Sequence, residues 1–398
     1  MKVILFVTHY ENKLMVAARR WRMLVSFLRK EGMHFSIVTP GLEDKEYIGE
    51  FGESVCVFKA RSGHRKGKSG SILGESRRVI PSPVPCLDVS LLLWFRAIND
   101  QRIIDHCIKS DMLISTYGPA GPMLYGLMMA RKYKKSWVLD IRDSFQPGHS
   151  VSSKILSGFN GWLERKILGQ ASLVITVGQR LAQYLTEKYQ CSVEYIYNGW
   201  TDADPLYIDQ RSKNQANYFL YAGSIHQHQL PALKIFLVSL SAYGNYRLRI
   251  RLIRDYSGNI SQWSKENGFE DIIDIYPPVS SDQLSREMRD SVGVLVIEDI
   301  NPLDWQKGTV TGKLFSLLVS GLPGIVISHQ DVEVYQLAAK ASGWFCTSDL
   351  ESTRKTIKKV IEFDRTKIID NRRTMSEYHY SIQAKKFAGL CQKTMNKE

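Results

Sequence analysis

A short loop at residues 308–312, rich in glycine and threonine, is followed at once by Lys313. Apolar residues at helical spacing come next, over 314–318, and Gly321 and Pro323 are expected to end the helix. A loop that enters a helix presents unpaired backbone N–H groups and the positive end of the helix dipole to an anion. The pattern predicts a phosphate site, the alternative being a loop with a purely structural role. Its residues are Gly308, Thr309, Val310, Thr311, Gly312 and Lys313.

Two further groups of candidates follow predicted strands in the same half of the chain. The loop after the strand 218–222 contains Gly223, Ser224 and His226, which we expect to contact the same ligand. Arg254 follows the strand 247–253 and is a second candidate cation. The alternatives are a loop histidine without a ligand and an arginine that is only a surface charge.

The predicted strand 136–140 in the first half ends in Asp140-Ile141-Arg142-Asp143. In open α/β sheets the ligand crevice lies at the carboxyl ends of the strands. Arg142 and Asp143 are therefore candidates to position an acceptor or a base. An Asp–Arg pair that only fixes the loop is the alternative.

The elements that must position these residues alternate between strand and helix in both halves. The first half opens with a strand at 2–8, a helix at 13–30 and a strand at 35–39, and the pattern restarts at 218 after a polar tract at 201–217. The first loop lacks the GxGxxG fingerprint, which argues against a dinucleotide enzyme. We expect an α/β fold of two doubly wound, Rossmann-like domains that face an interdomain cleft.

The domain boundaries follow from this pattern. We assign residues 1–200 to an N-terminal, acceptor-binding domain and residues 201–375 to a C-terminal, donor-binding domain. Residues 376–398 should form a helix that returns to the N-terminal domain. The length of 398 residues also favours two domains over one.

Composition indicates a soluble protein. The chain is 44% hydrophobic and 23% charged, and no apolar run approaches the roughly 20 residues that cross a bilayer. The apolar run at 3–7 is followed by charged residues and not by a cleavage site. The six cysteines show no metal-binding spacing, which favours isolated thiols. We expect a cytoplasmic protein with no metal or other cofactor.

The formal net charge of +13 indicates an anionic partner. Residues 61–78 form a basic, Gly/Ser-rich segment, and a proline-rich stretch then leads into an apolar helix with Trp94. A basic loop beside an apolar aromatic helix predicts attachment to an anionic membrane surface. A solvated loop and an ordinary core helix at 91–95 are the alternatives.

Four stretches resemble the retaining GT-B glycosyltransferases of family 4, in particular those of bacterial surface polysaccharide assembly. They are the opening KVILFVT, the segment 114–145 with a DxRDxW-like turn in which Phe145 replaces the tryptophan, the pair Asn198-Gly199, and GTVTGKLFSLLVSGLPGIVI at 308–327. The last resembles the family's donor helix and is the most specific. The resemblance implies a nucleotide-sugar donor and a glycan or polyprenyl-diphosphate-linked acceptor.

Two departures from the family pattern concern the donor site. In the family, two glutamates stand eight residues apart here, the second accepting hydrogen bonds from the ribose; this chain has Gly308 and Ser316. Losing the ribose carboxylate should weaken donor binding by about 10–100-fold. Ser316 is expected to keep one neutral hydrogen bond to the ribose.

The resemblance implies a retaining transferase without a protein nucleophile. We expect Lys313, Arg254 and Asp143 to carry the chemistry, with Lys313 stabilising the departing diphosphate. The enzyme would work at the inner face of the plasma membrane. The alternative is a non-catalytic relative that acts as a scaffold for another transferase. Nucleic-acid binding would explain the charge but has no motif to support it.

Overall fold

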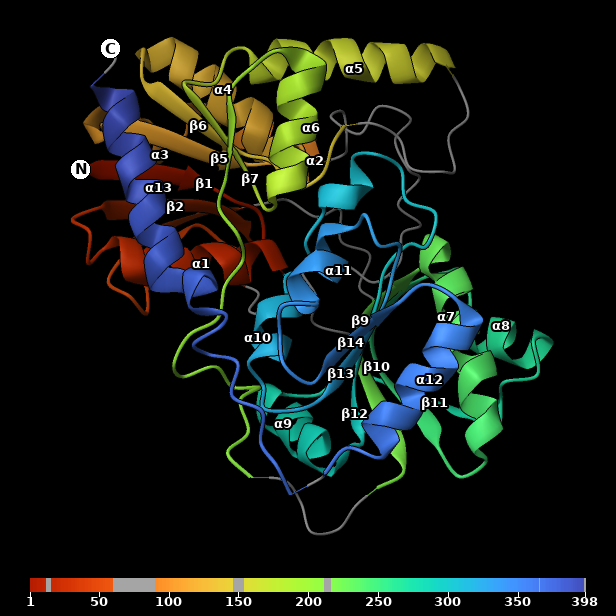
Figure 1. The fold of residues 1–398 in the computed structure, drawn as a ribbon. Coiled ribbons are helices and arrows are strands. Elements are labelled where there is room, and N and C mark those ends of the chain that lie inside the picture. Colours follow the sequence, from red (N-terminus) through yellow and green to blue (C-terminus); the bar gives the residue numbers. More distant parts are fainter. Residues whose placement is uncertain (12–15, 60–89, 146–153, 211–215, 365, 397–398) are drawn as a thin grey trace. The chain divides into compact units, whose positions relative to one another are not determined.

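The computed structural model describes residues 1–11, 16–59, 90–145, 154–210, 216–364 and 366–396. The chain divides into two compact units (Figure 1). Unit 1 contains Met1–Tyr197 and Tyr380–Glu398, and unit 2 contains Asn198–His379. The sequence placed these divisions after residues 200 and 375, a few residues away.

Unit 1 is built on an eight-stranded sheet with the order β3-β4-β2-β1-β5-β6-β7-β8. All neighbours pair in parallel except β3, which runs antiparallel to β4. The strands are β1 Lys2–Phe6, β2 His34–Gly41, β3 Lys45–Ile48, β4 Ser54–Lys59, β5 Met112–Thr116, β6 Ser136–Asp140, β7 Leu173–Thr176 and β8 Val193–Tyr195. The helices are α1 Val16–Leu28, α2 Ser90–Phe95, α3 Gln101–Lys109, α4 Gly121–Tyr133, α5 Lys154–Leu168, α6 Gln179–Tyr189 and α13 Tyr380–Met395. The sequence analysis missed β3, β4 and α3.

The last helix, α13, belongs to the core of unit 1. Its buried residues Ala384, Phe387 and Cys391 belong to the apolar cluster formed by β1, β2 and α1. The rings of Phe387 and Trp21 pack edge to face, with their centroids 5.7 Å apart. The end of the chain is thus held in unit 1 by apolar burial.

The helix at 91–95 differs from its expected role. Trp94 is 1% exposed and packs against Phe6, Phe58 and Tyr125, so it is a core residue and not a membrane anchor. Two other apolar side chains of α2 do face outward, Leu92 and Phe95. The basic segment 61–78 and the proline-rich stretch lie outside the described residues.

Unit 2 is a six-stranded parallel sheet with the order β11-β10-β9-β12-β13-β14. The strands are β9 Tyr218–His226, β10 Arg247–Tyr256, β11 Ile273–Tyr276, β12 Gly293–Ile297, β13 Gly324–Ile327 and β14 Trp344–Thr347. The helices are α7 Leu230–Leu240, α8 Ile260–Glu266, α9 Ser281–Asp290, α10 Leu314–Leu318, α11 Glu333–Ala338 and α12 Leu350–Ile361. The core strands are rich in β-branched residues, as parallel strands buried on both faces should be.

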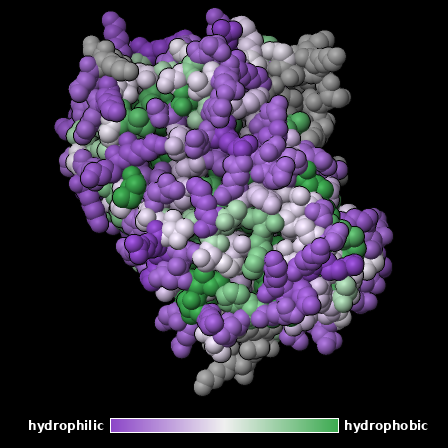
Figure 2. Space-filling model, viewed as in Figure 1, coloured by the Kyte–Doolittle hydropathy of each residue, from purple (hydrophilic) through white to green (hydrophobic). Residues whose placement is uncertain are grey.

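Hydrophilic side chains cover most of the face in Figure 2, and the hydrophobic ones lie in scattered small groups. None of the helices in the described ranges has the length and apolar character needed to cross a membrane.

Candidate functional site

The candidate site lies at the carboxyl ends of β9, β10 and β12 in unit 2. Chain order reverses at β9, because β10 lies on one side of it and β12 on the other. In doubly wound sheets, ligands bind outside the carboxyl ends of strands at this switch point. Residues that follow β9 and β12 are therefore brought together although they lie far apart in sequence.

Lys313 is anchored at this point. Its Nζ donates a hydrogen bond to the Ala222 carbonyl at 2.8 Å and lies 3.9 Å from the centre of the Tyr221 ring. Gly223 makes room for it, since a Cβ on Gly223 would stand 2.6 Å from Nζ. The sequence thus named two residues, Gly223 and Lys313, that the fold brings into contact.

Glu298 is a charged neighbour of Lys313 that the sequence analysis missed. It directly follows β12, so its position at a strand end was the available signal. Burial lowers the pKa of the Lys313 ammonium, and the charge of Glu298 opposes this effect. Burial likewise raises the pKa of Glu298 against the influence of Lys313. The pair places a cation and a carboxyl group at one strand edge.

His226 is held as a neutral imidazole. It ends β9, which runs through Gly223 and Ser224 where a loop was expected. A ring nitrogen of His226 accepts a hydrogen bond from the backbone N–H of Gln229. In return, the Gln229 side-chain oxygen accepts one from the backbone N–H of His226 at 3.0 Å. Burial lowers its pKa to about 4, with smaller contributions from His228 and Lys313. A neutral ring leaves one N–H that can donate to a ligand.

A stack of rings continues from His226. The His228 ring lies 5.3 Å on one side, and Tyr256 of β10 stacks on His226 at 4.6 Å. Arg254 is exposed and donates to the Tyr256 hydroxyl at 3.0 Å. Arg254 is therefore linked to the site by its hydrogen bond to Tyr256. Arg254 lies within β10, which ends two residues later at Tyr256.

The loop at 308–312 differs from the expected phosphate cradle. The helix that follows it, α10, has only five residues, so its dipole is small. Val310 is buried, and its carbonyl accepts a hydrogen bond from Asn198 at 3.4 Å. Gly308 is also buried, at the end of a 3₁₀ turn, whereas Thr311 and Gly312 are half-buried. Within the described ranges, the buried Thr309 hydroxyl has no hydrogen-bond partner.

Ser316 does not stand free for a ribose. It is fully buried, and its hydroxyl donates a 2.6 Å hydrogen bond to Asp204 Oδ2. Asp204 also accepts the Leu206 N–H at 3.0 Å. The Ser316 hydroxyl therefore gives its proton to a carboxylate in this structure, and a hydrogen bond between Ser316 and a ribose stays a prediction.

The candidates of unit 1, Arg142 and Asp143, follow β6. The Arg142 guanidinium donates to the carbonyl of Gly118 at 2.7 Å and to that of Tyr117 at 3.3 Å, so it fixes the loop after β5. Asp143 is exposed at the same edge. Asp140 is fully buried with Arg20, as an ion pair at 3.3 Å.

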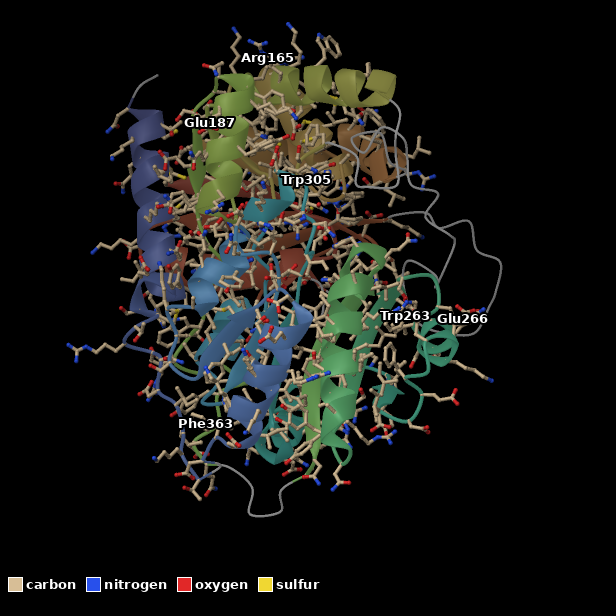
Figure 3. All side chains as sticks on the ribbon, turned by 45° about the vertical axis from the view of Figure 1, so that its right-hand side comes forward. Arg165, Glu187, Trp263, Glu266, Trp305 and Phe363 are labelled. Carbon is tan, nitrogen blue, oxygen red and sulfur yellow. The ribbon has the colours of Figure 1, made fainter. Side chains whose placement is uncertain are left out.

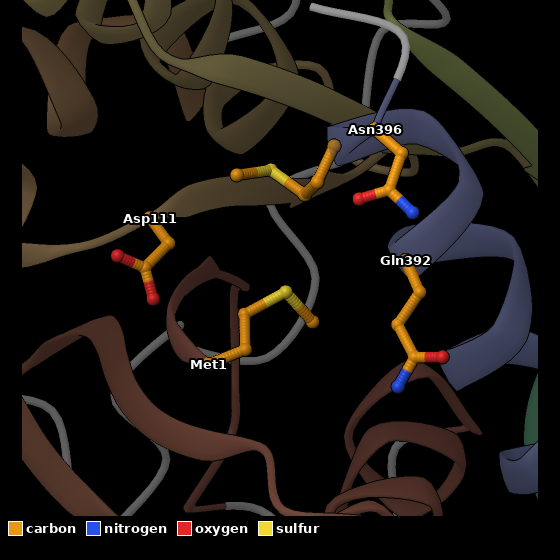
Figure 4. Close-up of a pocket in the computed structure, with 5 residues that line it drawn as sticks. Met1, Asp111, Gln392 and Asn396 are labelled. Atoms are coloured by element: carbon orange, nitrogen blue, oxygen red, sulfur yellow. The ribbon is translucent and has the colours of Figure 1, made fainter.

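A separate pocket opens at the opposite edge of the unit 1 sheet (Figure 4). It is lined by Met1, Asp111, Gln392, Met395 and Asn396. Met1 and Asp111 precede β1 and β5, so the pocket lies at the amino ends of these strands. Within the described ranges, no group of His, Cys, Asp and Glu is arranged to hold a metal ion.

Solved structures share this architecture along the whole chain. Sucrose-phosphate synthase from Thermosynechococcus elongatus has a TM-score of 0.73 at 10% identity, with 100% of each chain covered. Anabaena HepE in complex with UDP and glucose has a TM-score of 0.66 at 13% identity, covering 99% of this chain and 100% of its own. The outer core galactosyltransferase WaaB has a TM-score of 0.59 at 12% identity, covering 98% and 100%.

These likenesses define the fold as GT-B, as the sequence analysis predicted. Residues 17–202 also match the model of Glycosyltransferase Family 4. That match covers most of unit 1 and stops soon after unit 2 begins. No curated protein matches the chain by sequence.

Proposed function

We propose that the protein is a family 4 glycosyltransferase that transfers a sugar from a nucleotide-sugar donor to a glycan or lipid-linked acceptor. The observation that carries the proposal is Lys313, held at the switch point of unit 2 beside His226 and Glu298. Two solved HepE structures of the same fold contain UDP and UDP-glucose. We therefore take UDP-sugars as the first donors to test.

The chemistry would rest on charge. As the glycosidic bond of the donor breaks, negative charge develops on the leaving diphosphate, and a fixed cation stabilises this charge most strongly in the transition state. The Lys313 ammonium has three N–H donors, and the Ala222 carbonyl takes one. The neutral His226 N–H and the Thr309 hydroxyl are further donors. We assign no protein nucleophile, which accords with a retaining mechanism in which the acceptor hydroxyl attacks the face that the nucleotide leaves.

For the remaining candidates we propose supporting roles. Gly223 and Ser224 supply the close backbone approach beside Lys313, and Arg254 adds positive charge through Tyr256. Asp143 is proposed to position the acceptor in unit 1, because it is exposed at the carboxyl edge of that sheet. No metal or cofactor enters this mechanism.

The acceptor is proposed to be carried on a polyprenyl diphosphate in surface polysaccharide synthesis, at the cytoplasmic face of a membrane. The net charge of +13 supports an anionic partner of this kind. A diphosphate-linked lipid presents anionic charge at the headgroup level, where a basic protein surface is attracted to it.

The test combines donor binding with transfer. We expect a UDP-sugar to raise the melting temperature of the protein, since a ligand that binds only the native state stabilises it. Lys313→Met should abolish the shift and lower transfer at least about 100-fold. Lys307→Met is the matched control, because Lys307 lies in the same segment but pairs with Asp304 at 2.9 Å. Binding that survives in Lys313→Met would reject the proposed donor site.

A non-catalytic scaffold is the second candidate, favoured by the buried Ser316–Asp204 bond at the position of the missing glutamate. A scaffold would show no transfer with any nucleotide sugar. Its complex with a partner transferase would also survive Lys313→Met unchanged.

A further inference from the structure

The outward face of α5 carries two adjacent aromatic side chains that are each about half exposed. Phe159 is 43% exposed and Trp162 is 55% exposed, and their ring centroids lie 5.8 Å apart. One turn further on, Arg165 and Lys166 are exposed as well. In Figure 3 the Arg165 side chain points away from the body of unit 1. We call Phe159, Trp162, Arg165 and Lys166 the α5 face.

The opposite side of α5 binds the helix to unit 1. Asn160, Glu164, Ile167 and Leu168 are all buried. Glu164 is the only acidic residue of the helix, and its carboxylate accepts hydrogen bonds from the Ser144 hydroxyl at 3.0 Å and the Phe145 N–H at 2.8 Å. The outward side of α5 therefore carries aromatic and basic groups and no carboxylate.

Further positive charge lies beside the carboxyl end of α5. Arg131 of α4 hydrogen-bonds to Gln170, which lies two residues beyond α5, so the carboxyl ends of the two helices are neighbours. Arg131, Lys132 and Lys134 are all exposed. The aromatic pair thus adjoins a surface region with five exposed basic residues, namely Arg131, Lys132, Lys134, Arg165 and Lys166.

We propose that the α5 face docks on an anionic lipid membrane, with Phe159 and Trp162 in the headgroup region and the basic residues against the lipid charges. Trp favours the membrane interface, where its apolar ring can contact the acyl chains while its N–H bonds to water or a headgroup. An amphipathic helix that lies in this plane gains from apolar burial and from attraction to anionic headgroups together. The inference rests on the membrane partner in the proposed function, but not on catalysis.

The exposed apolar pair on α2 is the competing surface. Leu92 and Phe95 are 68% and 54% exposed, against 43% and 55% for Phe159 and Trp162. If exposed apolar area alone decided docking, α2 would bind a membrane at least as well. One exposed basic residue, Arg96, follows the α2 pair, whereas two follow the α5 pair and three more lie beside them on and just after α4.

The experiment is sedimentation of the full chain with sucrose-loaded vesicles of phosphatidylcholine, with or without phosphatidylglycerol. We expect binding only to the anionic vesicles, and weaker binding as salt rises. The double change Phe159→Ser with Trp162→Ser should lower the partition coefficient at least about tenfold. Arg165→Gln with Lys166→Gln should lower it roughly fivefold per charge. Leu92→Ser with Phe95→Ser, the matched control, should leave it nearly unchanged.

Each result supports or overturns the proposal. Unchanged binding of the α5 variants, or loss of binding in the α2 variant alone, would overturn it. No binding of the wild type to anionic vesicles would also overturn it, and the exposed pair would then be assigned to a protein partner. The melting-temperature shift with a UDP-sugar is measured on the same samples. A docking failure with an intact shift would leave the donor site standing.

Discussion

The two sheets have similar strand orders but use their carboxyl edges differently. In unit 1 the polar groups there bond mainly to the protein itself: Arg142 holds the carbonyls of the β5 loop, and Asp140 is buried with Arg20. In unit 2, Lys313, His226 and Tyr256 lie together at strand ends. The contacts described above use only part of their hydrogen-bond donors and ring faces. The comparison teaches that a shared fold fixes where a site can form, whereas the side chains decide whether that edge bonds to the protein or is open to a ligand.

The largest expected effect comes from a change at the carboxyl edge of the unit 1 sheet, where Asp140 pairs with Arg20. Asp140→Asn removes the carboxylate charge that faces the buried Arg20 guanidinium and should cost about 3–5 kcal/mol of stability. Asp274→Asn, which breaks the more exposed pair with Arg247, should cost no more than about 1 kcal/mol. Urea unfolding measures both changes, with hydrogen exchange of β6 reporting on unit 1 and of β11 on unit 2. Equal losses would show that Asp140 is no more important than a surface partner.

The next effect tests whether Ser316 stabilises unit 2 or contacts the donor. Ser316→Ala removes a hydrogen bond to a buried carboxylate and should cost about 1.5–3 kcal/mol of stability in unit 2. Donor affinity should change little, because the hydroxyl is bonded to Asp204. Thermal unfolding and donor titration are measured on one sample. A tenfold loss of affinity with unchanged stability would instead support the ribose contact that the sequence predicts for Ser316.

A smaller effect concerns the pH dependence of unit 2. The unfolded chain protonates His226 near pH 6.5, but the native pKa is about 4, so the unfolded state binds more protons between these values. Stability should therefore fall as pH drops from 6.5 to 4 and then level off. After allowance for solvent screening, the loss is at most about 2 kcal/mol.

The check is the free energy of unfolding at several pH values for wild type and His226→Gln. The variant should lack this part of the pH dependence. His329→Gln, at a histidine whose side chain is 38% exposed, is the control. Parallel curves for wild type and His226→Gln would mean that His226 protonates alike in both states.

The smallest effect tests the space beside Lys313. In Gly223→Ala the new Cβ would stand 2.6 Å from Nζ, and the flexible ammonium can move aside at little cost in stability. Donor affinity should fall about tenfold, or about 1.4 kcal/mol, because the cation leaves its position. Gly389→Ala on α13, where a new Cβ would meet no atom within 4 Å, is the control for a glycine change. Full affinity in Gly223→Ala would mean that the exact position of Lys313 is unimportant.

The sequence predicted the alternation of strands and helices well, because long apolar β-branched runs and helical periodicity are local signals. It missed β3, β4, α3 and α11, whose apolar patterns are short or interrupted by polar residues. The helix after residue 312 was expected to be longer than α10, since an apolar run that leads to Gly321 looks helical even where the chain turns early.

Within the site, the sequence named Lys313, Gly223 and His226 from strand ends and loop composition. It missed Glu298 and Tyr256, which lie at strand ends without a motif to single them out. It also gave Ser316 to the ligand, because nothing in the sequence links that position to Asp204, which lies 112 residues earlier. Trp94 was assigned to a surface for the same reason.

The sequence by itself determined the fold class, the two-part division and the residues that could carry charge at a strand end, since each depends on local pattern. Only the tertiary structure decided which of those residues meet, which are bonded to the protein, and which aromatic side chains face outward. Contacts between distant segments and the burial they produce are set by how strands and helices assemble, and no short stretch of sequence encodes them.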